Sequence, residues 1–352
     1  MYIDHISLLR LTGFITGAMF LALGARRLRS SASARADVRL LFATGCSLLL
    51  LSIFPESVAL LSDAIFPEQR PGNRLLTILM IAVVVIWCFV LRERSKGARR
   101  DQQIDLLVRT ITLERFLLSL GENVRRQGIL ILMPAHNEAQ SLGGLLARIP
   151  TEIGHLPVTV LVINDGSSDE TRAVAESHGA LVLDIPFNRG GGAALRAGYD
   201  VADALGAEIA VTMDADGQHQ PQEIPGLVGP ILRDEADLVI GSRVLGDMEN
   251  YSVVRKMGVY TFNLLINLLM ATRVTDCASG FRAMRLHAVR KLRPIQDQYH
   301  TAELIIQAAK AGLRVTERPI FIARRRHGQS KKGNNLYYAA NFLRTVVKTW
   351  WQ

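Results

Sequence analysis

The stretch EIAVTMDADGQHQP, residues 208–221, decides the fold. Its first six residues are mostly apolar and include β-branched side chains, which predicts a short buried strand over 208–213. The strand ends in an acidic turn that holds Asp214 and Asp216, and Pro221 stands where the next helix begins. A buried strand followed by a polar turn and a helix is typical of α/β proteins, whose ligands gather at the carboxyl ends of strands.

Similar units flank this stretch from Gly128 onward, where β-rich runs alternate with helical patterns. Strands are predicted at 129–133, 157–163, 180–185, 208–213 and 237–241. Polar turns follow three of these strands: PAHNE at 134–138, NDGSSD at 164–169 and DADGQ at 214–218. Because ligands of such sheets bind at the carboxyl ends of the strands, the three turns are expected to share one site. The pattern predicts an α/β domain with a mostly parallel sheet.

The acidic turn after residue 213 has the chemistry of a metal site. Asp214 and Asp216 offer oxygen ligands to a hard cation, and Gln218 is placed to add a ligand or a supporting contact. An isolated Asp-x-Asp is more often a solvated turn. The second acidic strand end, at Asp165, favours the metal site.

Two further carboxylates are candidates for binding a nucleoside. Asp165 can accept hydrogen bonds from a base edge or a ribose hydroxyl, and Glu138 is a similar candidate, although it could equally complement a helix dipole. The glycines in NRGGG, at 188–192, open a helix and permit close approach of phosphate. Leu195 stands where a dinucleotide fingerprint needs its last glycine, so a nicotinamide-binding domain is disfavoured.

Seven motifs occur in order between about residues 128 and 333: PAHNE, NDGSSDET, FNRGGGAALRAG, DADGQHQP, GSR, DCASGFRAM and RRHGQSKKG. This set resembles the family-2 glycosyltransferases of the dolichol-phosphate mannose synthase and polyprenyl-phosphate glucose synthase type. The resemblance implies a GT-A (Rossmann-like) fold, a Mg²⁺ or Mn²⁺ ion, inversion at the anomeric carbon and a polyprenyl phosphate acceptor.

The resemblance also implies roles for single residues. The donor would be bound by Pro134, Glu138, Asp165, Asp214 and Asp216. The metal would be held by Asp214, Asp216 and Gln218. Phosphates and the acceptor would meet Arg243, Arg255, Arg282, Arg325, Ser330 and Lys331, with Asp216 and Arg243 as the catalytic pair. His136 departs from the family, which often has tyrosine there, so uridine and guanosine both stay open.

The first 91 residues differ in composition from the rest. Apolar segments at 6–24, 38–61 and 75–91 are each about long enough to cross a ~30 Å hydrocarbon layer. A signal peptide is disfavoured, because the basic cluster follows the first apolar run instead of preceding it. Basic residues at 26–39 and 92–100 place the amino terminus outside and the remainder in the cytoplasm.

The expected architecture is therefore an all-α membrane module of three transmembrane helices followed by an α/β catalytic domain. The boundaries are 1–91 for the membrane module, 92–127 for a helical linker, 128–335 for the GT-A domain and 336–352 for an amphipathic C-terminal segment. The apolar helix predicted at 252–270 is interpreted as interfacial, cradling a lipid chain. A buried core helix is the alternative.

The resulting hypothesis is an integral protein of the cytoplasmic membrane, with its catalytic domain in the cytoplasm, that transfers a hexose from UDP- or GDP-sugar to polyprenyl phosphate. Its partners would be the nucleotide sugar, the lipid and the membrane, and a homo-oligomer is left open. The net charge of +9 also fits nucleic acid, but no aromatic residues interleave the basic ones. The alternatives are a non-catalytic scaffold with a nucleotide-binding fold and a processive polysaccharide synthase. The latter needs a Gln-x-x-Arg-Trp element, which the sequence lacks.

Overall fold

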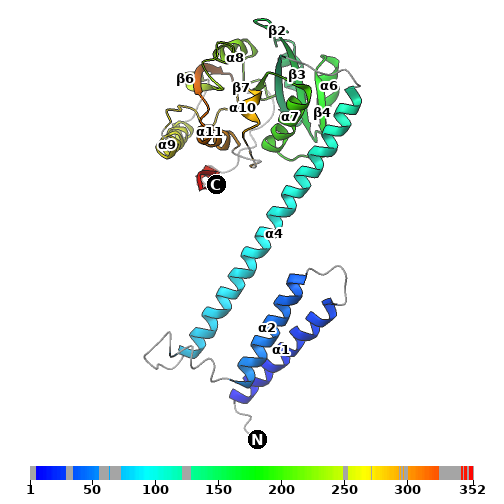
Figure 1. Cartoon of the computed structure of the whole chain (residues 1–352), viewed down its shortest axis with the longest axis vertical. Helices are drawn as coiled ribbons and strands as arrows, with labels where there is room; N and C mark the ends of the chain where they lie inside the picture. Colours follow the sequence, from blue (N-terminus) through cyan, green and yellow to red (C-terminus); the bar gives the residue numbers. More distant parts are fainter. Residues whose placement is uncertain are drawn as a thin grey trace. The chain divides into compact units, whose positions relative to one another are not determined.

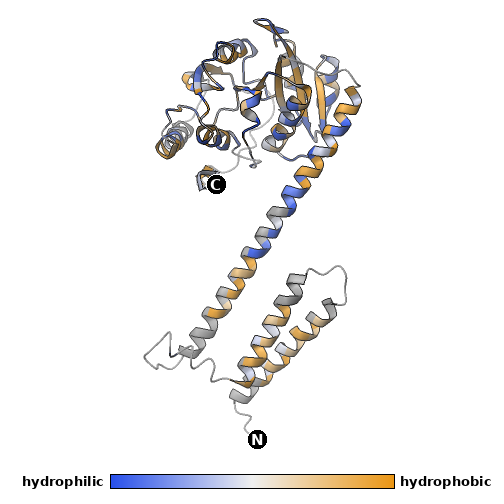
Figure 2. Cartoon of the chain, viewed as in Figure 1, coloured by the Kyte–Doolittle hydropathy of each residue, from blue (hydrophilic) through white to orange (hydrophobic). Residues whose placement is uncertain are grey.

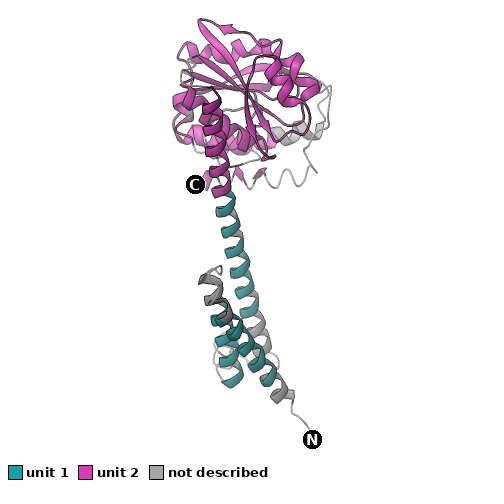
Figure 3. Cartoon of the chain, turned by 90° about the vertical axis from the view of Figure 1, so that its right-hand side faces the viewer, with its two compact units in different colours: residues 1–101 teal, residues 102–352 magenta. Residues whose placement is uncertain are grey.

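The chain forms two compact units, Met1–Asp101 and Gln102–Gln352 (Figures 1 and 3). The computed structural model describes residues 5–28, 35–54, 63, 73–120, 128–248, 253–270, 272–292, 294, 296, 300–324, 342–343, 345–346 and 349–351. The predicted domain boundaries stay predictions.

The first unit contains two helices that pack along each other, α1 (His5–Leu28) and α2 (Arg35–Ile53). Small residues set their spacing. A Cβ added to Gly17 would lie 3.0 Å from the carbonyl oxygen of Gly45, so a side chain there would push the two backbones apart. The glycines therefore permit close packing of α1 on α2.

Among the described residues, no helix is both long enough and apolar enough to span a bilayer. The predicted module of three transmembrane helices is therefore wrong. A span needs about 20 predominantly apolar residues.

The helix that contains the third apolar segment is longer than predicted. The apolar segment at 75–91 and most of the segment predicted as a linker form one helix, α4 (Asn73–Leu120). Figure 2 shows hydrophobic residues along its first part and hydrophilic ones where it continues past Leu91. A change of hydropathy did not end the helix, because the charged residues of this stretch are themselves good helix formers.

The second unit is built on a mixed sheet. Within the described residues the sheet has eight strands in the order β2-β3-β1-β5-β7-β6-β8, with β4 paired to β3. The strands are β1 (Ile129–Ala135), β2 (Glu152–Ile153), β3 (Leu156–Asp165), β4 (Leu181–Ile185), β5 (Ile209–Thr212), β6 (Leu238–Met248), β7 (Arg282–Arg285) and β8 (Val315–Ile322). The predicted sheet was mostly parallel, whereas β7 runs antiparallel to both β5 and β6.

Helices cover both faces of the sheet (Figure 1). They are α5 (Ala139–Leu146), α6 (Thr171–Ser177), α7 (Gly191–Leu205), the 3-10 turn η1 (Pro221–Glu223), α8 (Ile224–Leu232), α9 (Val253–Met270), α10 (Leu286–Val289) and α11 (His300–Lys310). Side chains of β1 alternate between the two cores. Leu130 and Leu132 belong to the core on the side of α7 and α11, whereas Ile129, Ile131 and Met133 belong to the core on the side of α5 and α8. Burial on both faces explains why β1 is continuously apolar.

Candidate active site

Three polar turns lie at one edge of the sheet because their strands run parallel. β1 pairs with β3 from Ile129↔Val158 to Ala135↔Asn164, and β1 pairs with β5 through Leu132↔Thr212. The turns PAHNE, NDGSSD and DADGQ therefore follow neighbouring strands at the same edge. The register confirms that the three turns lie at one edge of the sheet, and that they share one ligand site stays a prediction.

Hydrogen bonds join the turns after β1 and β3. Nδ1 of His136 lies 2.7 Å from the carbonyl oxygen of Asp165, and the backbone N–H of Asn137 donates to Oγ of Ser167. Glu138 follows as the N-cap residue of α5, and its Oε2 accepts a hydrogen bond from Ser141. Pro134 lies within β1 opposite Ile163. The donor-binding roles of Pro134 and Glu138 stay predictions.

Asp165 is buried at the end of β3, where its carboxylate accepts two backbone hydrogen bonds. Oδ1 accepts from the N–H of Arg189 at 2.7 Å, and Oδ2 accepts from the N–H of Gly190 at 2.8 Å. The amino end of α7 thus carries a carboxylate of the chain itself, at a position that favours negative charge. Gly166 makes the approach possible, because its φ is +64° and a Cβ there would lie 2.6 Å from the backbone of Phe187.

The acidic turn after β5 holds the three residues predicted to bind metal. Asp214 is exposed, Asp216 is 8% exposed, and Oδ1 of Asp216 accepts the backbone N–H of Gln218 at 3.1 Å. Nε2 of Gln218 donates to the carbonyl oxygen of Ala323, which leaves its Oε1 as the atom able to bind a cation. A Cβ at Gly280 would lie 3.4 Å from both carboxylate oxygens of Asp214, so this glycine keeps the space beside Asp214 clear.

These donors fit a hard cation. Two carboxylates and one amide oxygen supply part of a six-fold oxygen shell, and phosphate oxygens and water would complete it. Among the described residues, no group of three His, Cys, Asp or Glu side chains comes together to hold a metal without such help. The metal-binding roles of Asp214, Asp216 and Gln218 stay predictions.

His219 orders this turn, a role that the sequence did not reveal. Its Nδ1 accepts the backbone N–H of Asp214 at 3.2 Å, and its ring stacks on Phe281 with 4.8 Å between ring centroids. Burial lowers the pKa of His219, although the carboxylates of Asp214 and Asp216 act in the opposite direction. The neutral imidazole is therefore the form that accepts the N–H.

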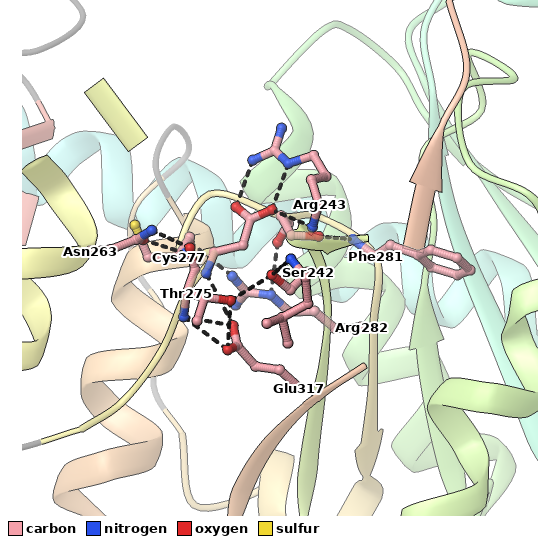
Figure 4. A network of polar contacts seen from close by, with 11 residues as sticks. Ser242, Arg243, Asn263, Thr275, Cys277, Phe281, Arg282 and Glu317 are labelled. Atoms are coloured by element: carbon pink, nitrogen blue, oxygen red, sulfur yellow. Dashed lines mark hydrogen bonds and ion pairs between the residues drawn. The ribbon is translucent and has the colours of Figure 1, made fainter. Parts of the chain in front are cut away.

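Arg243 is held by a fully buried carboxylate (Figure 4). Its Nε and Nη2 donate to the two oxygens of Asp276 at 2.6 and 2.7 Å, and its backbone N–H donates to Oδ2 at 3.0 Å. A bidentate pair of this kind fixes the plane of the guanidinium. The fold itself thus sets the orientation of this arginine, and its binding of phosphate stays a prediction.

A second carboxylate supports Asp276 from β8. Glu317 accepts the backbone N–H groups of Thr275 and Asp276 at 2.9–3.1 Å, and it accepts the hydroxyl of Thr275 at 2.8 Å. Oγ of Ser242 also lies 2.6 Å from Oγ1 of Thr275 (Figure 4). Burial raises the pKa of Glu317, and the three donors oppose this shift. The sequence did not identify this residue, because it lies 41 residues from Asp276.

Arg282 has a different environment from Arg243. Its guanidinium is buried and donates to the carbonyl oxygens of Ser279, Cys277 and Thr301. Burial lowers its pKa to about 10. These bonds tie the segment before β7 to the start of α11, and its contact with an acceptor phosphate stays a prediction.

The remaining predicted phosphate ligands lie outside what the structure describes. Arg255 is in α9, but its side chain is not described, and Arg325, Ser330 and Lys331 fall outside the described residues.

Comparisons with known proteins identify the family of the chain. Residues 130–293 match the family model described as Glycosyl transferase family 2. The undecaprenyl-phosphate mannosyltransferase of Micrococcus luteus is 33% identical over 220 residues, which cover 59% of this chain and 88% of that protein. The polyprenol monophosphomannose synthase of Mycolicibacterium smegmatis is 30% identical over 223 residues, which cover 60% of this chain and 83% of that protein.

A solved structure shares the fold. Glucosyl-3-phosphoglycerate synthase from Mycobacterium tuberculosis, in complex with Mn²⁺, UDP-glucose and phosphoglyceric acid, aligns with a TM-score of 0.50 and 20% identity. The alignment covers 63% of this chain and 79% of that one. At this identity the likeness shows the fold alone, and it confirms the GT-A-like α/β part of the predicted architecture.

Proposed function

The chain belongs to glycosyl transferase family 2 and is a glycosyltransferase, and from that premise we propose that it transfers a hexose from a nucleotide-diphosphate sugar to a polyprenyl phosphate. The resemblance inferred from the seven motifs is confirmed by the family match. The observation that carries the proposal is the arrangement of an acidic turn, Asp214 and Asp216, with a pre-oriented arginine, Arg243, in one α/β unit.

The acceptor class is supported by the relatives. Their names include an undecaprenyl-phosphate mannosyltransferase, a polyprenol monophosphomannose synthase and a dolichol-phosphate mannosyltransferase of Pyrococcus furiosus. The relatives also include a UDP-N-acetylglucosamine–dolichyl-phosphate N-acetylglucosaminyltransferase of Methanococcus voltae, so the sugar differs among them while the lipid phosphate is common. The acceptor is therefore the better supported half of the reaction.

The donor side of the proposal rests on the acidic turn. A UDP- or GDP-sugar would place its diphosphate at Asp214 and Asp216, with Mg²⁺ or Mn²⁺ held by these carboxylates and Gln218. A divalent cation supplies charge neutralisation for the departing nucleoside diphosphate. The bound Mn²⁺ and UDP-glucose of the mycobacterial structure support this choice by analogy of fold.

The reaction needs little acid–base help from the protein. An oxygen of the lipid phosphate, already an anion near neutral pH, would attack the anomeric carbon as the bond from that carbon to the diphosphate oxygen breaks, with inversion. The protein must hold two anions close together and in line. Arg243, held in plane by Asp276, fits the task of offsetting the repulsion between them.

The lipid chain would lie along α9. Tyr260, Leu264 and Leu268 are exposed at four-residue spacing, so they form one stripe along the helix. The same helix is tied to the arginine site, because Oδ1 of Asn263 accepts the N–H of Cys277, next to Asp276 (Figure 4). We propose that α9 lies at a membrane surface, on the cytoplasmic side, where the lipid phosphate is available.

The test is a transfer assay with the full chain. Membranes or reconstituted protein would be incubated with radiolabelled UDP- and GDP-sugars, a polyprenyl phosphate and MgCl₂ or MnCl₂. We expect label in a chloroform-soluble product, lost when EDTA is added. Transfer only to water, to a protein or to a growing polysaccharide would contradict the proposal, whichever sugar is used.

A further inference from the structure

The C-terminal part of α4, from Gln102 to Leu120, packs on the catalytic unit although it lies outside the segment that matches the family. Phe116 and Thr112 are buried against this unit, and Val108 and Leu117 pack on the same core. This contact is therefore made by residues that precede the segment matching the family. The contact also includes polar side chains.

One carboxylate on this helix meets three arginines. Oδ1 of Asp105 lies 3.2 Å from Nη2 of Arg189 and 3.0 Å from Nη2 of Arg196, and Oδ2 lies 3.6 Å from Nη1 of Arg109. The side chains of Asp105 and Arg189 are each 15% exposed, and that of Arg196 is 7% exposed. A pair shielded to this degree is weakly screened by salt, so it holds its partners in place.

Arg189 connects this cluster to the site. Its backbone N–H and that of Gly190 donate hydrogen bonds to the carboxylate of Asp165 at the end of β3. The residue is therefore held at both ends, by Asp165 through the backbone and by Asp105 through the guanidinium. Its guanidinium also lies 5.8 Å from the ring centroid of Phe187 in the same loop.

We infer that Asp105 is a positioning residue for the nucleotide donor, acting through Arg189 on the loop 187–190 and on Asp165. This inference rests on the proposed function, since it takes the edge at Asp165 as the donor side. Without the Asp105 carboxylate, Arg189 loses its side-chain anchor, and the loop can leave Asp165. The donor then meets a less ordered surface, while the acceptor arginine, Arg243, keeps its own partner, Asp276.

A simpler explanation is that Asp105 merely attaches α4 to the catalytic unit. A second ion pair between α4 and α7 allows the two explanations to be tested separately. Arg109 donates from Nε and Nη2 to Asp200 of α7 at 2.6–2.8 Å. Among the described residues, no hydrogen bond or ion pair joins Asp200 to the loop 187–190. Loosening α4 at Asp200 leaves Arg189 on Asp105.

The experiment compares Asp105→Asn with Asp200→Asn in the full chain. Binding of UDP and of GDP in the presence of Mg²⁺ is measured by calorimetry, and the KM values for the nucleotide sugar and for polyprenyl phosphate are measured in the transfer assay. We expect Asp105→Asn to weaken nucleotide binding and raise the donor KM about five-fold, the size typical of one ion pair. The acceptor KM is expected to stay unchanged, and Asp200→Asn to change neither.

A double variant tests the route through the loop. If Asp105 acts through Arg189, then Asp105→Asn combined with Arg189→Gln weakens nucleotide binding no more than Arg189→Gln alone. Equal effects of Asp105→Asn and Asp200→Asn, or unchanged nucleotide binding in Asp105→Asn, would overturn the inference. Because binding is measured apart from transfer, a wild-type chain that binds nucleotide but transfers no sugar would count against the proposed function and leave the comparison of variants valid.

Discussion

Single residues at the site are held by carboxylates that lie behind them. Asp276 orients Arg243, Glu317 orients Asp276, and Asp165 holds the loop at Arg189. Each carboxylate accepts several hydrogen bonds, so its oxygens are satisfied although it is partly or wholly buried. The residues expected to meet substrate therefore have their positions set before substrate binds, which lowers the cost of ordering them in the transition state.

Asp216 is the residue whose loss should be most severe. In Asp216→Asn the turn keeps an acceptor for the N–H of Gln218, so the fold is expected to persist, whereas the charge that would hold the cation is gone. We expect kcat to fall about 100-fold or more, the size found when one charge-stabilising group is removed from an active site. Transfer rate and thermal unfolding would both be measured. Glu152→Gln, an exposed change on β2, serves as the control. Wild-type turnover in Asp216→Asn would rule out the metal assignment.

Glu317 should affect the acceptor step and spare the donor. Glu317→Gln replaces an acceptor-only group by one whose amide faces the donors of Thr275 and Asp276, so the segment that holds Arg243 shifts. Hydrogen bonds to charged groups contribute about 1.5–3 kcal/mol, so we expect kcat with polyprenyl phosphate to fall about ten-fold or more. Nucleotide binding by Glu317→Gln is expected to equal that of the wild type. The control Glu235→Gln, at an exposed position, is expected to change neither kcat nor nucleotide binding. A selective loss of nucleotide binding would contradict this role.

At the scale of elements, parts of the site could be predicted from sequence because they are local. The strands at 129–133, 157–163 and 208–213 show their apolar runs and their polar turns in single short stretches. Arg243 and Asp276 come from β6 and from the segment before β7, whose antiparallel pairing no local pattern encodes. Without that pairing, neither the carboxylate behind Arg243 nor the mixed character of the sheet could be foreseen.

The pairing of β6 with β8 brings Glu317 opposite Ile240, three residues before Arg243. An ion pair between Asp237 and Arg314 lies next to the start of these two strands. Asp237 accepts the backbone N–H, Nε and Nη2 of Arg314 at 2.9–3.1 Å, directly before the register Leu238↔Val315 and Ile240↔Glu317 begins. The Arg314 guanidinium lowers the pKa of Asp237 to about 2, against an opposing effect of burial. The start of both strands thus depends on the ionised form of Asp237.

The linkage gives a pH-dependent prediction. Because the pKa of Asp237 is depressed in the folded chain, its contribution to stability is present above its unfolded value of about 3.9 and is lost as pH falls toward 2. Asp237→Asn should therefore lower the free energy of unfolding by about 1 kcal/mol at pH 7, and the difference from wild type should shrink between pH 4 and pH 2. Denaturant unfolding at several pH values measures it. A difference that stays constant down to pH 2 would show that the ion pair is not its source.

At the scale of the whole molecule, the chain joins a family-2 catalytic unit to an additional unit at residues 1–101. The sequence indicated that this part is apolar and helical, and α1, α2 and α4 confirm the helices. It did not reveal that α4 continues into the catalytic unit, because a helix that crosses from apolar to charged sequence has the hydropathy pattern of two separate segments. The polar contacts of Asp105 could be found only from the structure.

The stripe on α9 allows the lipid acceptor to be tested as a property of the whole chain. Leu264 is 70% exposed and Leu268 is 80% exposed, so replacing both by serine costs the folded chain little, whereas a lipid chain lying on them would lose apolar contact. Partial burial of each leucine corresponds to about 1 kcal/mol, and the double variant should therefore raise the KM for a long polyprenyl phosphate about ten-fold or more.

The length of the acceptor distinguishes this effect from a general loss of activity. A short-chain prenyl phosphate presents the same phosphate to Arg243 but does not reach along the stripe, so its KM should be equal in the wild type and in Leu264→Ser/Leu268→Ser. Leu118→Ser, at an 82% exposed position on α4, is the matched control and should change neither KM. If the double variant impaired both acceptors equally, α9 would be acting on the phosphate site through Asn263 and Cys277, and the lipid chain would have to lie elsewhere.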